Sequence, residues 1–156
     1  MLSLIYGKPG TGKTYEAVRF HIIPNLKKKI KVVTNIPINF DDRYLVKIDN
    51  LTIKVIVDII DSATEELVFV LDEFQTLINE NRESWFQLFA QHRKFRTNFI
   101  IITQSPLSLP EKVKDLISFA HKTTQNPIFL KKSTYIKKTY DGLPSKNRIV
   151  VVNSKL

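Results

Sequence analysis

Short apolar runs recur along the chain, with helix-like segments between them. The run at 67–71 has no polar position, which is typical of a strand buried on both faces of a sheet. Strands that alternate with helices favour a parallel sheet with helices packed on both faces. We therefore expect an α/β fold whose core strands are 2–6, 31–34, 67–71, 99–102 and 117–123, with a weaker strand or loop at 45–48.

Helical spacing of apolar residues predicts the helices of the first half. One helix begins after the glycine-rich segment 7–14, and Pro24 followed by the lysines at 27–29 predicts its end. Another follows Asp49 or Asn50, either of which can serve as its N-cap.

Two helices are expected in the second half. Ser108 and Glu111 have the spacing of a capping box, which predicts a short helix to Ile117. The segment 84–95 repeats its large residues at helical intervals. Its inward face is expected to hold Trp85, Leu88, Phe89 and His92. We expect these residues to belong to the hydrophobic core rather than to a surface that stacks on nucleic-acid bases.

The pattern changes after residue 125. Alternating apolar and polar positions at 128–131, 133–140 and 148–152, interrupted by Asp141-Gly142 and Pro144, predict a small antiparallel β extension. We expect residues 1–125 to form the core and residues 126–156 to form a C-terminal β extension of the same domain. The lysines at 131–132 and 137–138 could line DNA, or they could blunt the exposed edge of a hairpin.

Composition narrows the possible functions. The 156 residues carry a formal net charge of +9 and no cysteine, which excludes disulfides, cysteine nucleophiles and thiolate metal sites. The positive charge fits a polyanionic partner or a solvated lysine-rich surface. No apolar run approaches the roughly 20 residues that span a bilayer, so we expect no transmembrane segment.

The first expected strand leads into G-x-x-x-x-G-K-T, the P-loop or Walker A pattern. Glycines let the backbone turn its N–H groups onto a polyphosphate, and the following helix offers its N-terminus to the same anion. Lys13 is expected to reach the β- and γ-phosphates, and the Thr14 hydroxyl to bind Mg²⁺. The predicted nucleotide-binding residues are Gly7, Lys8, Pro9, Gly10, Thr11, Gly12, Lys13, Thr14 and Tyr15.

Polar residues follow two other buried strands. Asp72 and Glu73 come directly after 67–71 and form a Walker B pattern, in which Asp72 holds Mg²⁺ and Glu73 activates water as a general base. Gln104 follows the strand at 99–102 and is a candidate sensor of the γ-phosphate; a polar strand end is the alternative. Ligands of parallel sheets lie at the carboxyl ends of the strands, so these residues should meet the P-loop.

Phosphoryl transfer commonly uses an additional cation on the developing charge. Arg93 and Arg96 are the candidates, acting on the site of a neighbouring subunit, with a plain surface role as the alternative. ATP is expected rather than GTP, because an N-K-x-D motif and a D-x-x-G motif are both missing.

The combined motifs resemble the zonula occludens toxin family, which includes the assembly ATPases of filamentous phages. The resemblance covers roughly residues 1–125. Its motifs are Gly7–Thr14, Thr34-Asn35-Ile36-Pro37, Leu71-Asp72-Glu73, His92-Arg93 and Thr103-Gln104.

The resemblance implies a P-loop NTPase of the RecA or additional-strand catalytic-glutamate type, which uses ATP and Mg²⁺ to drive virion assembly and export. It implies that Lys13, Glu73, Gln104 and Arg93 act in catalysis, and that Thr14 and Asp72 bind the metal. It also implies a homo-oligomeric ring in the host cytoplasm or at the cytoplasmic face of the inner membrane, with DNA or a membrane-embedded assembly protein as partner.

Family members usually continue into a transmembrane helix, which this sequence lacks, so related functions stay open. A viral DNA-packaging or DNA-translocating ATPase shares the same core motifs. A small nucleotide or metabolite kinase fits the size but needs an arginine-bearing lid, and no arginine-rich segment is visible. A non-catalytic nucleotide switch is the third alternative.

Overall fold

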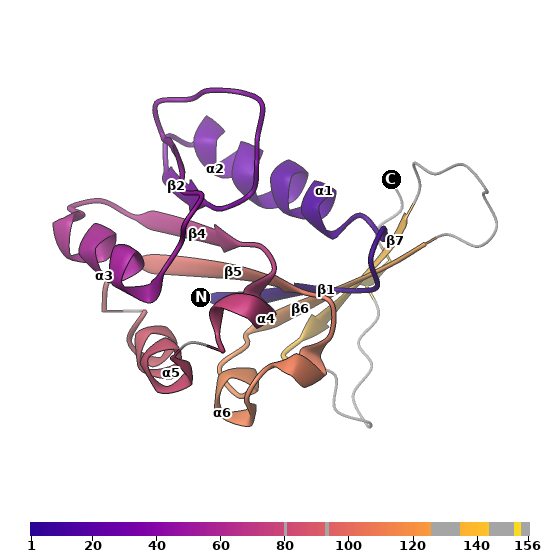
Figure 1. The fold of residues 1–156 in the computed structure, drawn as a ribbon. Helices are drawn as coiled ribbons and strands as arrows, with labels where there is room; N and C mark the ends of the chain where they lie inside the picture. The colour runs from indigo at the N-terminus through magenta and orange to yellow at the C-terminus, as the bar shows by residue number, and fades with distance from the viewer. Residues whose placement is uncertain (80, 93, 126–134, 144–151, 154–156) are drawn as a thin grey trace.

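The computed structural model describes residues 1–79, 81–92, 94–125, 135–143 and 152–153. Within them the strands form one eight-stranded sheet in the order β3-β2-β4-β5-β1-β6-β7-β8 (Figure 1). The pairs among β1 to β6 are parallel, and β7 and β8 join as antiparallel strands. The strands are β1 Leu2–Tyr6, β2 Lys31–Thr34, β3 Leu45–Lys47, β4 Leu67–Leu71, β5 Thr97–Thr103, β6 Phe119–Gln125, β7 Tyr135–Asp141 and β8 Val152–Asn153.

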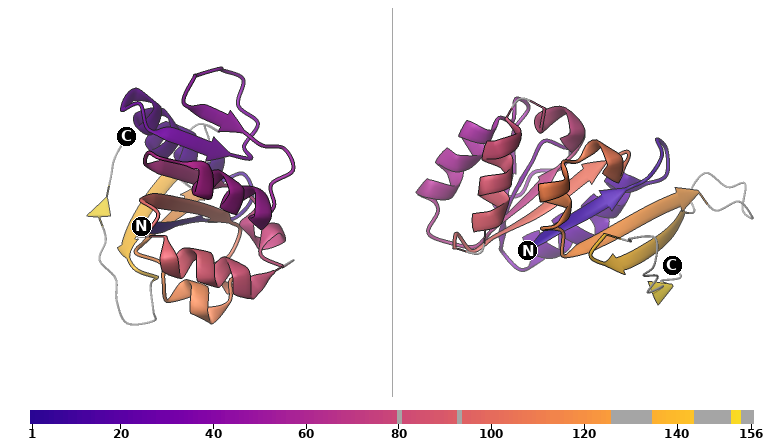
Figure 2. Two further views of the ribbon diagram at one scale, coloured as in Figure 1. Left: turned by 90° about the vertical axis from the view of Figure 1, so that its left-hand side faces the viewer. Right: turned by 90° about the horizontal axis from the view of Figure 1, so that it is seen from below.

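Helices cover both faces of this sheet (Figures 1 and 2). One continuous helical segment packs on one face, and it comprises α1 Lys13–Ala17, the π-helical turn η1 Val18–Ile22 and α2 Ile23–Lys27. The other face is covered by α3 Ile53–Ser62, α4 Phe74–Leu77, α5 Arg82–Gln91 and α6 Glu111–Lys114. A short 3-10 helix, η2 Pro106–Ser108, follows β5. The expected α/β fold with a mostly parallel, doubly covered sheet is confirmed.

The central strands are largely apolar, and both of their faces are buried. Leu4 and Ile5 are adjacent in β1, and neither has exposed surface. Leu4 belongs to the core under α3 to α6, whereas Ile5 belongs to the core under α1 and α2. Trp85 and Phe89 of α5 are buried in the first of these cores, as their helical spacing indicated.

Pro24 does not end the first helix, whereas the predicted lysines at 27–29 do mark its end. The helical segment continues to Lys27, and Pro24 lies in the first turn of α2. Pro24 has no N–H to donate to the preceding turn, and that turn is π-helical rather than α-helical. The π-helical turn before it changes the hydrogen-bond spacing so that a new helical start can follow without a break in the chain.

Three other local expectations are also wrong. The N-cap of α3 is Thr52, whose hydroxyl accepts from the backbone N–H of Val55, rather than Asp49 or Asn50. The predicted capping box of Ser108 is not formed, because its hydroxyl donates to the carbonyl oxygen of Ser105 and α6 begins later, at Glu111. Helix α5 ends at Gln91, four residues before the predicted 95.

The C-terminal region adds strands to the edge of the same sheet rather than forming a separate layer. Strand β7 pairs with β6 along its whole length, and β8 pairs with β7. The predicted strand at 128–131 and part of that at 148–152 lie outside the described residues. The division into a core at 1–125 and an extension at 126–156 stays a prediction.

None of the helices among the described residues is long and apolar enough to cross a membrane.

Candidate nucleotide-binding site

The P-loop joins β1 to α1 in a conformation that glycine makes possible. Gly10 and Gly12 have φ angles of 74° and 87°, in the left-handed region that glycine adopts without strain. Gly7 is required for another reason, because a Cβ atom there would lie 2.4 Å from the carbonyl oxygen of Thr123. The loop is therefore packed closely against β6, the neighbouring strand.

The Lys13 side chain folds back over this loop. Its Nζ donates a hydrogen bond of 3.0 Å to the carbonyl oxygen of Lys8, and the residue is 9% exposed. Lys8 itself is exposed. An ammonium group held against the P-loop is placed for a phosphate group to bind next to it.

Asp72 lies beside Thr14, although the two residues are far apart in the sequence. The Thr14 hydroxyl donates a hydrogen bond of 3.0 Å to Oδ2 of Asp72. Strand β4 ends at Leu71, so the half-buried Asp72 carboxylate projects from the same sheet edge as the P-loop. The contact joins the Walker A and Walker B patterns, which the order of the strands predicted would meet.

A polar residue at the end of β2 holds the backbone of Asp72. The Asn35 amide donates from Nδ2 to the Asp72 carbonyl oxygen (3.0 Å), and its Oδ1 accepts from the Asp72 N–H (2.7 Å). Asn35 belongs to the Thr34-Asn35-Ile36-Pro37 motif, and the sequence alone indicates no role for it. Its position directly after an apolar strand, like that of Gln104, is the signal that could have identified it.

Glu73 has an unusual backbone conformation. Its φ and ψ angles are 50° and 40°, and a side chain in this left-handed region costs about 1–2 kcal/mol. Such strained residues cluster at functional sites. The Glu73 side chain is exposed, its Oε2 accepts from the Gln75 amide, and its N–H donates to Oδ1 of Asp72 (2.8 Å). A carboxylate is thus exposed to solvent directly beside Asp72.

Gln104 and the P-loop line one cavity of about 500 Å³. Gly7, Lys8, Pro9 and Thr11 contribute from the loop, and Gln104 contributes from the end of β5. The opposite wall is formed by residues 122–125 of β6. Gln104 is exposed at this cavity, which Lys13, Thr14 and Asp72 do not line, so its sensor role stays a prediction.

The remaining predicted residues contribute less to this geometry. Tyr15 is 48% exposed, and its hydroxyl accepts from Arg19 on the next turn, 2.5 Å away. Arg93 lies outside the described residues, so its predicted role in a neighbouring site is a prediction only. Arg96 is exposed and has a φ angle of 50° at the turn before β5.

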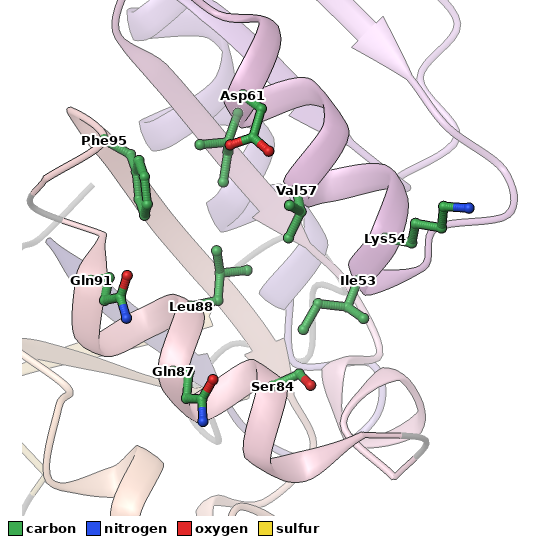
Figure 3. Close-up of a pocket in the computed structure, with 10 residues that line it drawn as sticks. Ile53, Lys54, Val57, Asp61, Ser84, Gln87, Leu88, Gln91 and Phe95 are labelled. Carbon is green, nitrogen blue, oxygen red and sulfur yellow. The ribbon is translucent and has the colours of Figure 1, made fainter.

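A separate pocket lies between α3 and α5 (Figure 3). It is open and largely apolar, with a volume of about 380 Å³, and Val57 and Phe95 are each 38% exposed beside it. None of the predicted nucleotide-site residues lines it. The sheet edge, rather than this pocket, therefore brings the charged and polar groups together.

Two histidines that are distant in the sequence, His21 in η1 and His121 in β6, lie side by side. The ring centroids of His21 and His121 are 5.6 Å apart. Burial, with the nearby charge of Lys137, lowers the pKa of His21 to about 4 and that of His121 to about 3. The pair was not predicted, because the two residues are far apart in the sequence. Among the described residues there is no group of three or more histidine, cysteine, aspartate or glutamate side chains that could hold a metal ion.

These histidines should make the free energy of unfolding depend on pH. Unfolded histidines bind protons near pH 6.5, whereas the folded pair stays neutral to about pH 4. Between these values the unfolded state binds more protons, so the free energy of unfolding should fall as pH falls. The limiting slope is about 1.4 kcal/mol per pH unit for each histidine.

Urea unfolding from pH 7 to pH 4.5 measures this slope. A variant with both His21→Asn and His121→Asn should show a smaller slope than the wild type. Equal slopes in the two proteins would contradict the assignment.

Solved structures with the same fold include viral NTPases. The genome packaging NTPase B204 from Sulfolobus turreted icosahedral virus 2, in complex with ATP-gammaS, has a TM-score of 0.71 and 14% identity over 99% of this chain and 98% of that chain. The KaiC-like protein PH0186 from Pyrococcus horikoshii has a TM-score of 0.60 and 14% identity, over 96% and 83%. Comparison with curated protein sequences gives no match.

The N-terminal domain of zonular occludens toxin from Neisseria meningitidis has a TM-score of 0.60 and 16% identity, over 92% of this chain and 84% of that chain. The family model of zonular occludens toxin matches residues 1–156, which extends beyond the roughly 125 residues covered by the motifs. The chain therefore belongs to the zonular occludens toxin (Zot) family and has the fold of a P-loop NTPase.

Proposed function

We propose that this protein is a Mg²⁺-dependent ATP hydrolase that acts as a motor in viral morphogenesis. The contact between the Thr14 hydroxyl and the Asp72 carboxylate supports this most strongly, because it joins the phosphate-binding loop to the acidic strand end. Family membership and the fold support the same class of function. ATP is the proposed nucleotide.

The residues at this edge can divide the reaction among them. The P-loop N–H groups and Lys13 hold the phosphates, and Lys13 exchanges its contact with the Lys8 carbonyl for phosphate oxygens. Glu73 accepts a proton from water as the water oxygen attacks the γ-phosphorus. The bond from that phosphorus to its bridging oxygen breaks, which yields ADP and phosphate. Gln104, at the rim of the cavity, contacts the γ-phosphate or the attacking water.

The oxygen pair of Thr14 and Asp72 suits Mg²⁺. This ion prefers hard oxygen ligands and is commonly held by one or two protein groups together with substrate phosphates, so it needs no larger protein cluster. The two oxygens are 3.0 Å apart and hydrogen-bonded to each other. Bound Mg²⁺ would neutralise charge that develops on the phosphates.

Asp72→Asn should raise the Mg²⁺ concentration for half-maximal ATPase activity by about tenfold or more, because a neutral amide is a poorer Mg²⁺ ligand. ATPase rates over a MgCl₂ titration at constant ATP measure this shift. Asp58→Asn, on the exposed side of α3, is the matched control and should leave the titration unchanged. An unshifted midpoint in Asp72→Asn would argue against the metal assignment.

Two tasks for this motor are compatible with the comparisons. Family membership favours virion assembly and export of the filamentous-phage type, carried out by a ring of subunits in the host cytoplasm with a membrane-embedded partner. The likeness to a genome packaging NTPase favours DNA packaging as the second candidate. The net charge of +9 is compatible with DNA, although the side chain of Lys137 faces the protein and pairs with Glu16.

Oligomer mass and ATPase rate, each measured with and without DNA, separate the two tasks. For an assembly motor we expect a ring by light scattering and hydrolysis that is indifferent to DNA. A packaging motor should hydrolyse ATP only when DNA is present, and its DNA affinity should decrease as salt increases. A monomer without ATPase activity under all four conditions would contradict the proposed motor.

A further inference from the structure

Strand β6 contacts the back of the P-loop through one threonine. The Thr123 hydroxyl lies 2.8 Å from the Thr11 hydroxyl, and both residues are buried. The Thr11 hydroxyl donates to the carbonyl oxygen of Lys8 (2.8 Å), and the Thr123 hydroxyl can donate either to Thr11 or to the carbonyl oxygen of Tyr6. A chain of hydrogen bonds thus runs from β6 to the carbonyl that Lys13 also contacts.

The loop fits against Thr123 without spare space. A Cβ atom on Gly7 would lie 2.6 Å from the Thr123 hydroxyl as well as 2.4 Å from its carbonyl oxygen. The same hydroxyl lies 3.4 Å from the carbonyl oxygen of Tyr6, the last residue of β1. The position of the P-loop is therefore tied to that of β6.

Strand β7 reaches the helix that follows the P-loop. Lys137 is the residue opposite Thr123 in the antiparallel pairing, so both side chains project from the same face. The Lys137 ammonium forms an ion pair with Glu16 of α1, which has no exposed surface. Glu16 lies two residues after Thr14, the proposed metal ligand. The ammonium also lies 5.0 Å from the centre of the Phe20 ring.

We propose that the β6–β7 strand pair is a positioning element of the nucleotide site, in which Thr123 fixes the P-loop and Lys137 fixes α1. The inference rests on the proposed ATP hydrolase and assigns the C-terminal strand a role in it. A buried ion pair adds little to stability by itself, because desolvation offsets the attraction, but it restricts the geometry of the elements that it joins. The loop backbone is thereby held in one arrangement before nucleotide arrives, and Lys13 has only to exchange the Lys8 carbonyl for phosphate oxygens.

Thr123→Val removes the hydroxyl and keeps the shape of the side chain. We expect the Kd for ADP and for ATP-gammaS, measured by calorimetry well below the melting temperature, to rise about three- to tenfold, the worth of one hydrogen bond. KM should rise with Kd, and kcat should change by less than about twofold, since positioning of the loop acts on binding. Thr123→Ser keeps the hydroxyl and should restore wild-type binding.

The matched control is Thr97→Val. Thr97 is also a buried strand threonine, but it lies at the start of β5, at the end of the sheet away from the P-loop. Its hydroxyl donates to the carbonyl oxygen of Phe95. It should lower the melting temperature without changing the Kd. Equal effects of the two valine variants on Kd, or a Kd within twofold of wild type in Thr123→Val, would overturn the positioning role.

A second variant tests β7 without leaving an unpaired charge. Glu16→Gln with Lys137→Met replaces the ion pair by neutral side chains of similar size and should also weaken nucleotide binding severalfold. Unchanged binding in this double variant would overturn the role of Lys137. If the wild type binds nucleotide and all these variants bind it with the same Kd, only the positioning inference is contradicted. If the wild type binds no nucleotide, the proposed function is contradicted as well.

Discussion

Glu73→Gln should lower kcat for ATP hydrolysis by at least about 100-fold, because a glutamine amide cannot accept the proton of the attacking water. ATP binding should be retained, since the P-loop and Lys13 are unchanged. The side chain is exposed beside Asp72, so the substitution requires no repacking. Steady-state phosphate release together with the Kd for ATP measures both quantities in one preparation.

Glu83→Gln is the matched control for this substitution. Glu83 is an exposed carboxylate in the first turn of α5, and its contact with Lys112 is 3.6 Å long. The control should hydrolyse ATP at the wild-type rate. If Glu73→Gln bound ATP tightly and also turned over at that rate, Glu73 could not be the general base.

Lys13→Met should reduce ATP affinity by roughly 10- to 100-fold, the expected effect of losing a charge-assisted hydrogen bond to phosphate. Hydrolysis should be lost at ATP concentrations that saturate the wild type. The Lys13 amine contacts only the Lys8 carbonyl among the hydrogen bonds found in the described part of the chain, so the fold should survive the change. Calorimetry with ATP-gammaS measures the affinity.

Lys31→Met provides the comparison for lysine loss. Lys31 is exposed at the start of β2, at the end of the sheet opposite the P-loop. The Lys31→Met variant should therefore bind ATP-gammaS with the wild-type Kd. Circular dichroism of all three proteins separates loss of binding from loss of fold. Wild-type affinity in Lys13→Met would contradict the proposed phosphate site.

The nucleotide site was predictable because its groups follow from local sequence and one topological rule. Gly7–Thr14 and Asp72-Glu73 each come directly after an apolar run, and parallel strands bring their carboxyl ends to one edge. The sequence pattern therefore predicted that Thr14 and Asp72 would approach each other, and the two are hydrogen-bonded. What each residue does there stays a prediction.

The features that sequence reasoning missed depend on tertiary contacts. The pairing of β6 with β7 places Lys137 beside Glu16, and neither the alternating pattern nor the lysine pair at 137–138 specifies that register. The π-helical turn before Pro24 was likewise not predicted, because apolar spacing does not distinguish it from an α-helical turn. Lys137 was grouped with a DNA-facing or edge-blunting surface, whereas it is largely buried against α1.

Phosphate release by the purified wild-type chain, with ATP in Mg²⁺ and in EDTA, tests the proposed function most directly. We expect steady turnover in Mg²⁺, none in EDTA, and none in a Glu73→Gln preparation that still binds ATP. An equal rate of phosphate release in EDTA would contradict a Mg²⁺-dependent ATP hydrolase. The same conclusion would follow if the oligomeric wild-type protein, saturated with MgATP, released no phosphate either with or without DNA.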